Sequence, residues 1–296
     1  MRHHYVYSTS ALVAVVGIVW LASVPAAGQV PTAATKATWD PPRTPDGQPD
    51  IQGYWANLRP LEGNLPFFGY SITGEGIEAH DLVASGRVRR YANMVVGGKL
   101  PYQPWALAKR EEYLANHNTP KKLEYVDTRL RCFLTGPPRL LLDSGSAEPP
   151  QIFQMPGYVL MLYEWNHGYQ IIPLDGSPHV EADIKLYQGD SRGRWEGNTL
   201  VIDVTNMKPG WFDNSGNFFG SSLHVVERWT LVDRDTLHYE ATVEDPTVFT
   251  SPWRVAVFTM TRRKEPGYEQ LEAPCHEGNH TIEHVFPGSW VSTVPR

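Results

Sequence analysis

Apolar and polar residues alternate along much of the chain from about residue 152 onward, and a period of two is typical of half-buried β-strands. The longest such run covers residues 159–171, where one strand face would carry Val159, Met161, Tyr163, Trp165, His167, Tyr169 and Ile171. Further strands are expected at residues 192–195, 199–204, 221–232, 236–243, 253–261 and 268–273. Turn formers separate several of these runs, as in Glu196-Gly197-Asn198.

The N-terminal third follows a different pattern. Residues 29–75 are predicted to form an irregular arm, because residues 41–50 are rich in proline and turn formers, although Trp55 is expected to touch the core. Residues 77–90 and 102–117 carry helical signals. The whole pattern predicts a mainly β protein, an antiparallel barrel or sandwich of lipocalin-like or calycin-like kind, with an irregular N-terminal arm and two short helices.

The first 28 residues have the pattern of a secretory signal peptide. Arg2, His3 and His4 precede an uncharged apolar run over residues 11–23, and small residues lead up to Gly28. The run is shorter than a membrane span requires, so we expect cleavage near Gly28 rather than an anchor. The predicted organisation is a signal peptide (1–28), an arm (29–75) and a single β-rich domain (76–296) in a periplasmic or secreted bacterial protein.

Composition narrows the class of partner. With 41% hydrophobic and 20% charged residues the chain is too apolar to be disordered. The formal net charge of −6 provides no broad basic field, so neither nucleic acid nor, after leader cleavage, a membrane is an expected partner. A small-molecule ligand is expected instead. The two cysteines, Cys132 and Cys275, are predicted to form a disulfide in an oxidising compartment; the alternative is two unpaired thiols.

Several phrases of the sequence together resemble a large family of exported bacterial hypothetical proteins with no established common activity. The phrases are RTPDGQPDIQGYW at 43–55, RCFLTGPPR at 131–139, YEWNH at 163–167, GDSRGRWEGNTLVID at 189–203, HVVER at 224–228 and CHEGN at 275–279. The resemblance covers nearly all of the chain after the leader. It implies export and a β-rich single domain, and it implies no catalytic assignment.

The sharpest motif is His-Glu-x-x-His at His276, Glu277 and His280, with His284 four residues further on. On a helix this spacing binds zinc through two imidazoles, with the glutamate as general base. Gly278 and the adjacent asparagine are poor helix formers, which disfavours that interpretation. A zinc-dependent hydrolase is therefore kept only as a minor alternative, and we expect no cofactor.

Strand parity singles out Glu227. In an extended segment Leu223, Val225, Glu227 and Trp229 point one way, and His224 and Arg228 point the other way. A carboxylate on an apolar face needs a partner or has a raised pKa. Glu227 is either paired with an arginine such as Arg139, Arg192 or Arg194, or it is a general acid or base in a pocket.

His167 is the other candidate acid–base group, because it is expected on the same strand face as several aromatic side chains. It is either a hydrogen-bonded core histidine or the titratable group of a pocket that it shares with Glu227. Supporting roles are assigned to His224 and Glu277, ring contacts to Tyr163, Trp165, Tyr169 and Trp229, and anion binding to Arg192 or Arg194. The alternative for both arginines is a solvated hairpin.

Two classes of function remain from the sequence. One is an exported, cofactor-independent enzyme that uses histidine–carboxylate acid–base chemistry, as a lyase, isomerase or hydrolase, on a small aromatic, lipid-like or sugar-like compound in a barrel cavity. The alternative is a periplasmic binding or carrier protein that uses the same cavity without turnover. The sequence has no nucleophile elbow, phosphate loop or dinucleotide fingerprint.

Overall fold

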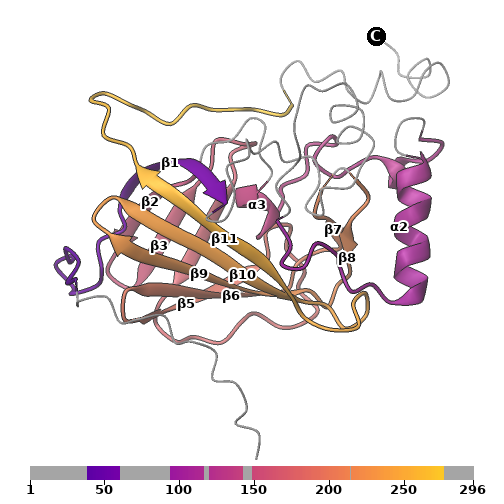
Figure 1. The fold of residues 1–296 in the computed structure, drawn as a ribbon, viewed down its shortest axis with the longest axis horizontal. Coiled ribbons are helices and arrows are strands. Elements are labelled where there is room, and N and C mark those ends of the chain that lie inside the picture. Colours follow the sequence, from indigo (N-terminus) through magenta and orange to yellow (C-terminus); the bar gives the residue numbers. More distant parts are fainter. Residues whose placement is uncertain (1–38, 61–93, 117–119, 143–148, 214, 277–296) are drawn as a thin grey trace, which may run out of the picture. The chain divides into compact units, whose positions relative to one another are not determined.

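The computed structural model describes residues 39–60, 94–116, 120–142, 149–213 and 215–276 (Figure 1). In these ranges the protein is mainly β. Its strands are β1 (Gly53–Pro60), β2 (Gln151–Met155), β3 (Tyr158–Leu162), β4 (Tyr169–Pro173), β5 (Asp190–Glu196), β6 (Thr199–Thr205), β7 (Gly210–Trp211), β8 (Phe218–Phe219), β9 (His224–Asp233), β10 (Thr236–Glu244) and β11 (Trp253–Arg262). Its helical elements are α2 (Pro104–Asn116), the 3₁₀ turn η1 (Leu123–Tyr125) and α3 (Arg139–Leu142).

Nine strands form one antiparallel, nearly closed, barrel-like sheet in the order β4-β3-β2-β1-β11-β10-β9-β6-β5. The two ends of this order, β4 and β5, contact each other. Gly193 on β5 permits the close approach, since a Cβ there would lie 2.5 Å from Cγ2 of Ile172 on β4. The expected antiparallel β fold is confirmed, as one nearly closed sheet.

Strand residues that alternate between buried and exposed positions send their buried side chains into the interior of this sheet. In β9 and β10 every second residue is buried, which matches the predicted parity of Val225, Glu227 and Trp229. The hairpin of β5 and β6 turns at Gly197, and that of β9 and β10 turns at Arg234, close to the predicted turns. Register shifts in the β1–β11, β10–β11 and β9–β10 pairs are of the kind that increases strand curvature.

Three expectations about strands are wrong. Residues 159–171 are not one strand, because Asn166 and His167 adopt left-handed φ angles of 48° and 53° and turn the chain between β3 and β4. Residues 268–273 lie outside the sheet, and only Ala273 makes an isolated bridge, to Trp165. The arm predicted over 29–75 is not irregular throughout, since it contributes β1 between β2 and β11.

The expected helix at 102–117 is confirmed as α2, and the one at 77–90 lies outside the described residues. Pro104 occupies the first position of α2. Tyr113 packs against Trp211 of β7 and Phe218 of β8, with ring centroids 4.8 and 5.5 Å apart. No helix among the described residues is long and apolar enough to cross a membrane.

The predicted disulfide between Cys132 and Cys275 is present, and it indicates an oxidising compartment. It joins the loop between η1 and α3 to the segment that follows β11. The side chain of Asn166 donates a hydrogen bond to the Cys132 carbonyl at 2.9 Å, so the β3–β4 turn also holds this loop. A long-range crosslink therefore anchors an otherwise irregular stretch of chain.

Candidate functional site

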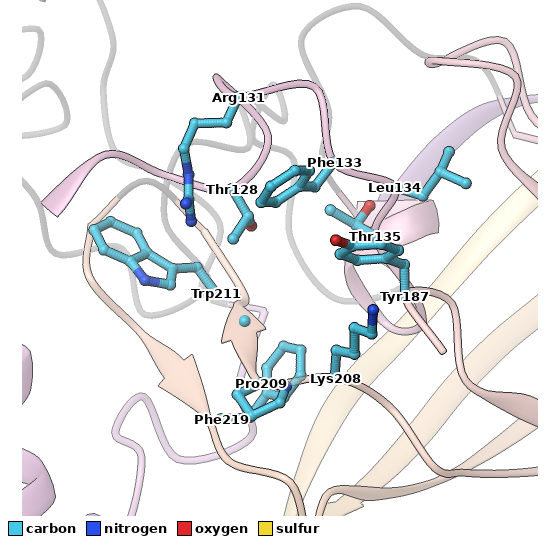
Figure 2. A pocket seen from close by; sticks show the side chains of 12 residues that line it. Thr128, Arg131, Phe133, Leu134, Thr135, Tyr187, Lys208, Pro209, Trp211 and Phe219 are labelled. Carbon is cyan, nitrogen blue, oxygen red and sulfur yellow. The ribbon is translucent and has the colours of Figure 1, made fainter. Parts of the chain in front are cut away.

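A pocket of about 270 Å³ opens between three loops beside the barrel-like sheet (Figure 2). The loop between η1 and α3 supplies one wall, the β4–β5 connection a second, and the chain leading into β7 and β8 a third. We call this the central pocket and define it by Arg131, Phe133, Tyr187, Lys208, Trp211 and Phe219. Phe133, Tyr187, Trp211 and Phe219 give it aromatic surface, as in many small-molecule sites.

Two cationic side chains of this pocket each lie against an aromatic ring, and the two rings lie next to each other. The guanidinium of Arg131 lies 4.9 Å from the ring centroid of Phe133, and the ammonium of Lys208 lies 4.3 Å from that of Tyr187. The rings of Phe133 and Tyr187 are themselves 5.2 Å apart, tilted by 32°. Figure 2 shows the four side chains around the hollow. Cation–aromatic contacts of this kind contribute about 0.5–2 kcal/mol each.

The central pocket is electropositive. No aspartate or glutamate occurs among its lining residues in the described part of the chain, and neither Arg131 nor Lys208 forms an ion pair there. Burial lowers the pKa of Arg131, against the raising effect of nearby Asp127, yet an arginine remains charged. The Nε of Arg131 is buried without a hydrogen-bond partner. An anionic group in the pocket would satisfy both cations.

A buried ion pair fixes two walls of the pocket. Arg139 bonds both oxygens of Asp127, at 2.7 and 2.5 Å, and donates to the carbonyl of Trp211 at 2.9 Å. Both charged side chains are only 2% exposed, so the pair is fully desolvated. Because Asp127 precedes Thr128, the pair connects the start of the Arg131 loop to β7. Asp127 therefore forms its ion pair with Arg139 and acts on Arg131 only as a nearby charge.

The third wall is positioned by backbone pairing. Leu186 bridges Met207 in a parallel arrangement, with Leu186 N–H donating to Asn206 O and Lys208 N–H donating to Leu186 O. Tyr187 and Lys208 are thus neighbours although twenty-one residues separate them in the sequence. The side chain of Asn206 adds hydrogen bonds to the carbonyls of Val180, Glu181 and Ile184. The loop carrying Tyr187 is therefore held at several points.

Two further pockets adjoin the central one. The α2 pocket, of about 430 Å³, shares Arg131, Trp211 and Phe219 with it and adds Trp105, Glu124 and Thr247. The β5 pocket, of about 340 Å³, shares Leu134 and Tyr187 with it and adds Tyr169, Gln170, Gln188, Asp190 and Ser191. The three pockets therefore border one another, and we call them together the groove.

Glu227 lies inside the barrel-like sheet, 1% exposed, and pairs with none of the described arginines. Its carboxylate accepts a 2.7 Å hydrogen bond from Gln170 Nε2, which also reaches Ser191 Oγ at 3.2 Å. Burial raises the pKa of Glu227 to about 7, although the Gln170 bond acts in the opposite direction. Gln170 and Ser191 both line the β5 pocket, so Glu227 is one side chain removed from the groove.

The expected arginine partners of Glu227 are all engaged elsewhere. Arg139 pairs with Asp127, Arg192 with Asp190 at 2.8 Å, and Arg194 with Glu196 at 2.8 Å. Arg192 and Arg194 do not line the groove. The interpretation of Glu227 as one half of an ion pair is therefore wrong. The assignment of Arg192 or Arg194 to anion binding stays a prediction.

His167 and Glu227 are not brought together. His167 is exposed in the β3–β4 turn, whereas Glu227 is buried, so the two do not face a common cavity. His224 is part of a surface chain in which Asp203 accepts hydrogen bonds from His179 and His224 at 2.9 and 3.0 Å. His276 is exposed, and Glu277, His280 and His284 lie outside the described residues.

The aromatic side chains that were predicted to contact a ligand lie partly in the core and partly at the surface. Tyr163 and Trp229 are core residues, 4% and 0% exposed, and Trp165 stacks under the guanidinium of Arg129 at 3.9 Å. Only Tyr169 lines the groove. Within the described ranges no group of three or more histidine, cysteine, aspartate or glutamate side chains could hold a metal ion.

Sequence reasoning missed Arg131, Phe133, Tyr187 and Lys208 as site residues. They come from three loops, which have no hydrophobic period to reveal them. One signal was available, since Arg131 and Phe133 flank Cys132 in the RCFLTGPPR phrase. Nothing local in the sequence connects that phrase to Lys208.

Comparison with known proteins gives no relative: no family model, no curated protein and no solved structure matches the chain. The resemblance to exported bacterial proteins stays a prediction.

Proposed function

We propose that this protein is an exported binding protein that holds a small ring compound with an acidic group in the groove. The observation that carries the proposal is the stack of Arg131, Phe133, Tyr187 and Lys208, which combines flat apolar surface with two cations that lack carboxylate partners among the described residues. A ring would pack on the aromatic walls, and its acidic group would pair with Arg131 and Lys208.

Export is part of the same proposal. We infer that residues 1–28 are a cleaved leader, and the disulfide between Cys132 and Cys275 supports an oxidising compartment for the folded chain.

The test uses two probes with the same rings and different charge, 1-naphthoate and its neutral amide 1-naphthamide, titrated calorimetrically. We expect the wild type to bind 1-naphthoate roughly tenfold tighter than the amide. Arg131→Gln and Lys208→Gln should each weaken 1-naphthoate and leave the amide unchanged. Arg194→Gln, which removes an exposed arginine outside the groove, is the matched control. Equal affinities for the two probes, or no effect of Arg131→Gln, would contradict the proposal.

Acid–base catalysis is the second candidate, and one observation favours it. A carboxyl group with a pKa of about 7 is suited to take and return a proton near neutral pH, and Gln170 connects Glu227 to the β5 pocket. His167, the histidine expected as its partner, is instead exposed in the β3–β4 turn. The test compares turnover of a groove ligand by the wild type and by Glu227→Gln. If the wild type converts the ligand and Glu227→Gln binds it without converting it, acid–base catalysis replaces binding as the function.

A further inference from the structure

The α2 pocket borders the central pocket along a wall that belongs to both. The residues that line both pockets are Thr128, Arg131, Pro209, Gly210, Trp211 and Phe219. The β5 pocket, in contrast, shares only Leu134 and Tyr187 with the central pocket. A ligand too long for the central pocket therefore extends more directly into the α2 pocket than into the β5 pocket.

The α2 pocket differs from the β5 pocket in the side chains that line it. Its aromatic lining residues are Trp105, Tyr113, Trp211, Phe218 and Phe219. The rings of Trp105 and Phe218 lie 6.1 Å apart at an angle of 62°. The β5 pocket has Tyr169 and Tyr187 beside the polar residues Gln170, Gln188, Asp190 and Ser191. Because clustered rings bind apolar and aromatic groups by burial, the α2 pocket is the better site for a second ring of a ligand.

The described lining of the α2 pocket offers an acidic group no cation beyond Arg131, which the central pocket shares. Its other charged lining residue is Glu124, whose carboxylate is paired with Lys122 at 3.5 Å. Lys208 lines the central pocket and not the α2 pocket. The acidic group of a ligand that reaches into both pockets therefore belongs in the central pocket, where it meets two cations, and the part in the α2 pocket is neutral.

Trp105 is an exposed ring that the protein holds in place. It lies in the first turn of α2 and is 54% exposed, yet its Nε1–H donates a hydrogen bond to the carbonyl of Thr247 at 3.1 Å. Gln103, just before α2, donates to the carbonyl of Pro246 at 2.9 Å, and Asp245 holds the same turn by accepting from Thr247 Oγ1 at 2.6 Å. A ring that is already fixed loses little conformational freedom when a ligand packs on it.

We propose that Trp105 is a specificity-determining residue of the groove, and that the ligand class is an elongated aryl carboxylate with two linked rings. The ring that bears the carboxylate occupies the central pocket, with its acidic group at Arg131 and Lys208. The second, neutral ring occupies the α2 pocket against Trp105. This inference rests on the proposed binding function and specifies the ligand class of the same site.

The test compares benzoate with biphenyl-4-carboxylate, which have the same acidic ring and differ by one further ring. By calorimetry we expect the wild type to bind biphenyl-4-carboxylate about tenfold tighter, since the second ring buries apolar surface in the α2 pocket. Trp105→Ala should reduce this ratio to about twofold. Trp105→Phe, which keeps a ring without the hydrogen bond to Thr247, should retain most of it.

The ratio of the two affinities is the readout, because a general loss of binding or stability in a variant weakens both probes together. The matched control is Tyr158→Ala, which removes a ring that is 43% exposed on β3 and lines none of the three pockets. This control should keep the tenfold ratio.

The outcomes separate this inference from the proposed function. A ratio near one in the wild type, or a ratio that Trp105→Ala leaves intact, overturns the inference. Loss of the ratio in Tyr169→Ala but not in Trp105→Ala would place the second ring in the β5 pocket and overturns it as well. If benzoate and 1-naphthoate bind in a manner that depends on Arg131 and Lys208 while the second ring adds nothing, the proposed function stands alone. If no aryl carboxylate binds, both fail.

Discussion

At the scale of single residues, some charged side chains of the described chain have an oppositely charged partner and others have none. Arg139 and Asp127 are buried together and form an ion pair with two hydrogen bonds between them. Arg131 and Lys208 rest on aromatic rings and have no carboxylate partner in the described ranges. Buried charges are normally paired, so an unpaired, partly buried arginine beside a pocket is a site that a ligand would complete.

Glu227 gives a residue-scale prediction about pH and stability. Its folded-state pKa of about 7 lies above the ordinary value of 4.5, so the folded protein binds more protons than the unfolded chain between these two pH values. The free energy of unfolding should therefore fall as pH rises through this window, by about 3 kcal/mol from this one group. Glu227→Gln should remove that contribution.

The measurement is urea unfolding of the wild type and Glu227→Gln at several pH values from 4.5 to 8. The difference between the two proteins isolates Glu227 from carboxyl groups whose pKa is lowered, such as Asp190 and Asp203, because these titrate equally in both. The variant should gain stability relative to the wild type as pH rises. A pH-independent difference would contradict the burial effect ascribed to Glu227.

At the scale of elements, most strands of the sheet could be predicted from the sequence pattern, whereas the loops of the groove could not. Strands β9 and β10 were predictable because each has one face in the core, which gives the sequence a period of two. Strands β5 and β6 were predictable from the glycine-containing turn between them, since β6 is buried on both faces. The β3–β4 turn was missed because aromatic residues continue the period through it, although Asn166 and Gly168 are turn formers. β1 was missed because it follows a proline-rich stretch.

The candidate site was predicted much less well than the sheet. Its position depends on the Cys132–Cys275 disulfide, the Asp127–Arg139 pair and the bridge at Leu186, all of which connect residues that are distant in sequence. Only the disulfide could be anticipated, because two cysteines allow one pairing. Loop-borne side chains such as Tyr187 and Lys208 carry no periodic signal, so their convergence appears only in three dimensions.

The disulfide supports an element-scale prediction. Cys132→Ser/Cys275→Ser should lower the free energy of unfolding by about 2–5 kcal/mol, because the crosslink closes a long loop in the unfolded chain. Affinity for 1-naphthoate should fall as well, since Arg131 and Phe133 flank Cys132 in a loop that would lose its anchor.

Urea unfolding and calorimetric titration of this double variant check both effects, with the oxidised wild type in the same buffer as the reference. The titration is performed where the variant is still folded, as judged by near-ultraviolet circular dichroism. Unchanged affinity in the folded variant would show that the Asp127–Arg139 pair and the β3–β4 turn hold the loop without the disulfide.

At the scale of the whole described fold, the groove lies outside the interior of the barrel-like sheet. Large side chains fill that interior, including Trp229, Tyr239 and Phe258, all fully buried. The groove instead lies where loops from one part of the sheet meet α2, β7 and β8. A rigid sheet that presents variable loops can change its ligand without changing its core.

The central claim is that Arg131 and Lys208 bind the acidic group of a ring compound in the central pocket. The most direct test is a crystal structure of the protein with 1-naphthoate. The account predicts the naphthoate ring against Phe133 and Tyr187, and its carboxylate about 3 Å from the side-chain nitrogens of Arg131 and Lys208. Naphthoate bound inside the barrel-like sheet near Glu227, or an empty central pocket at saturating ligand, would contradict it.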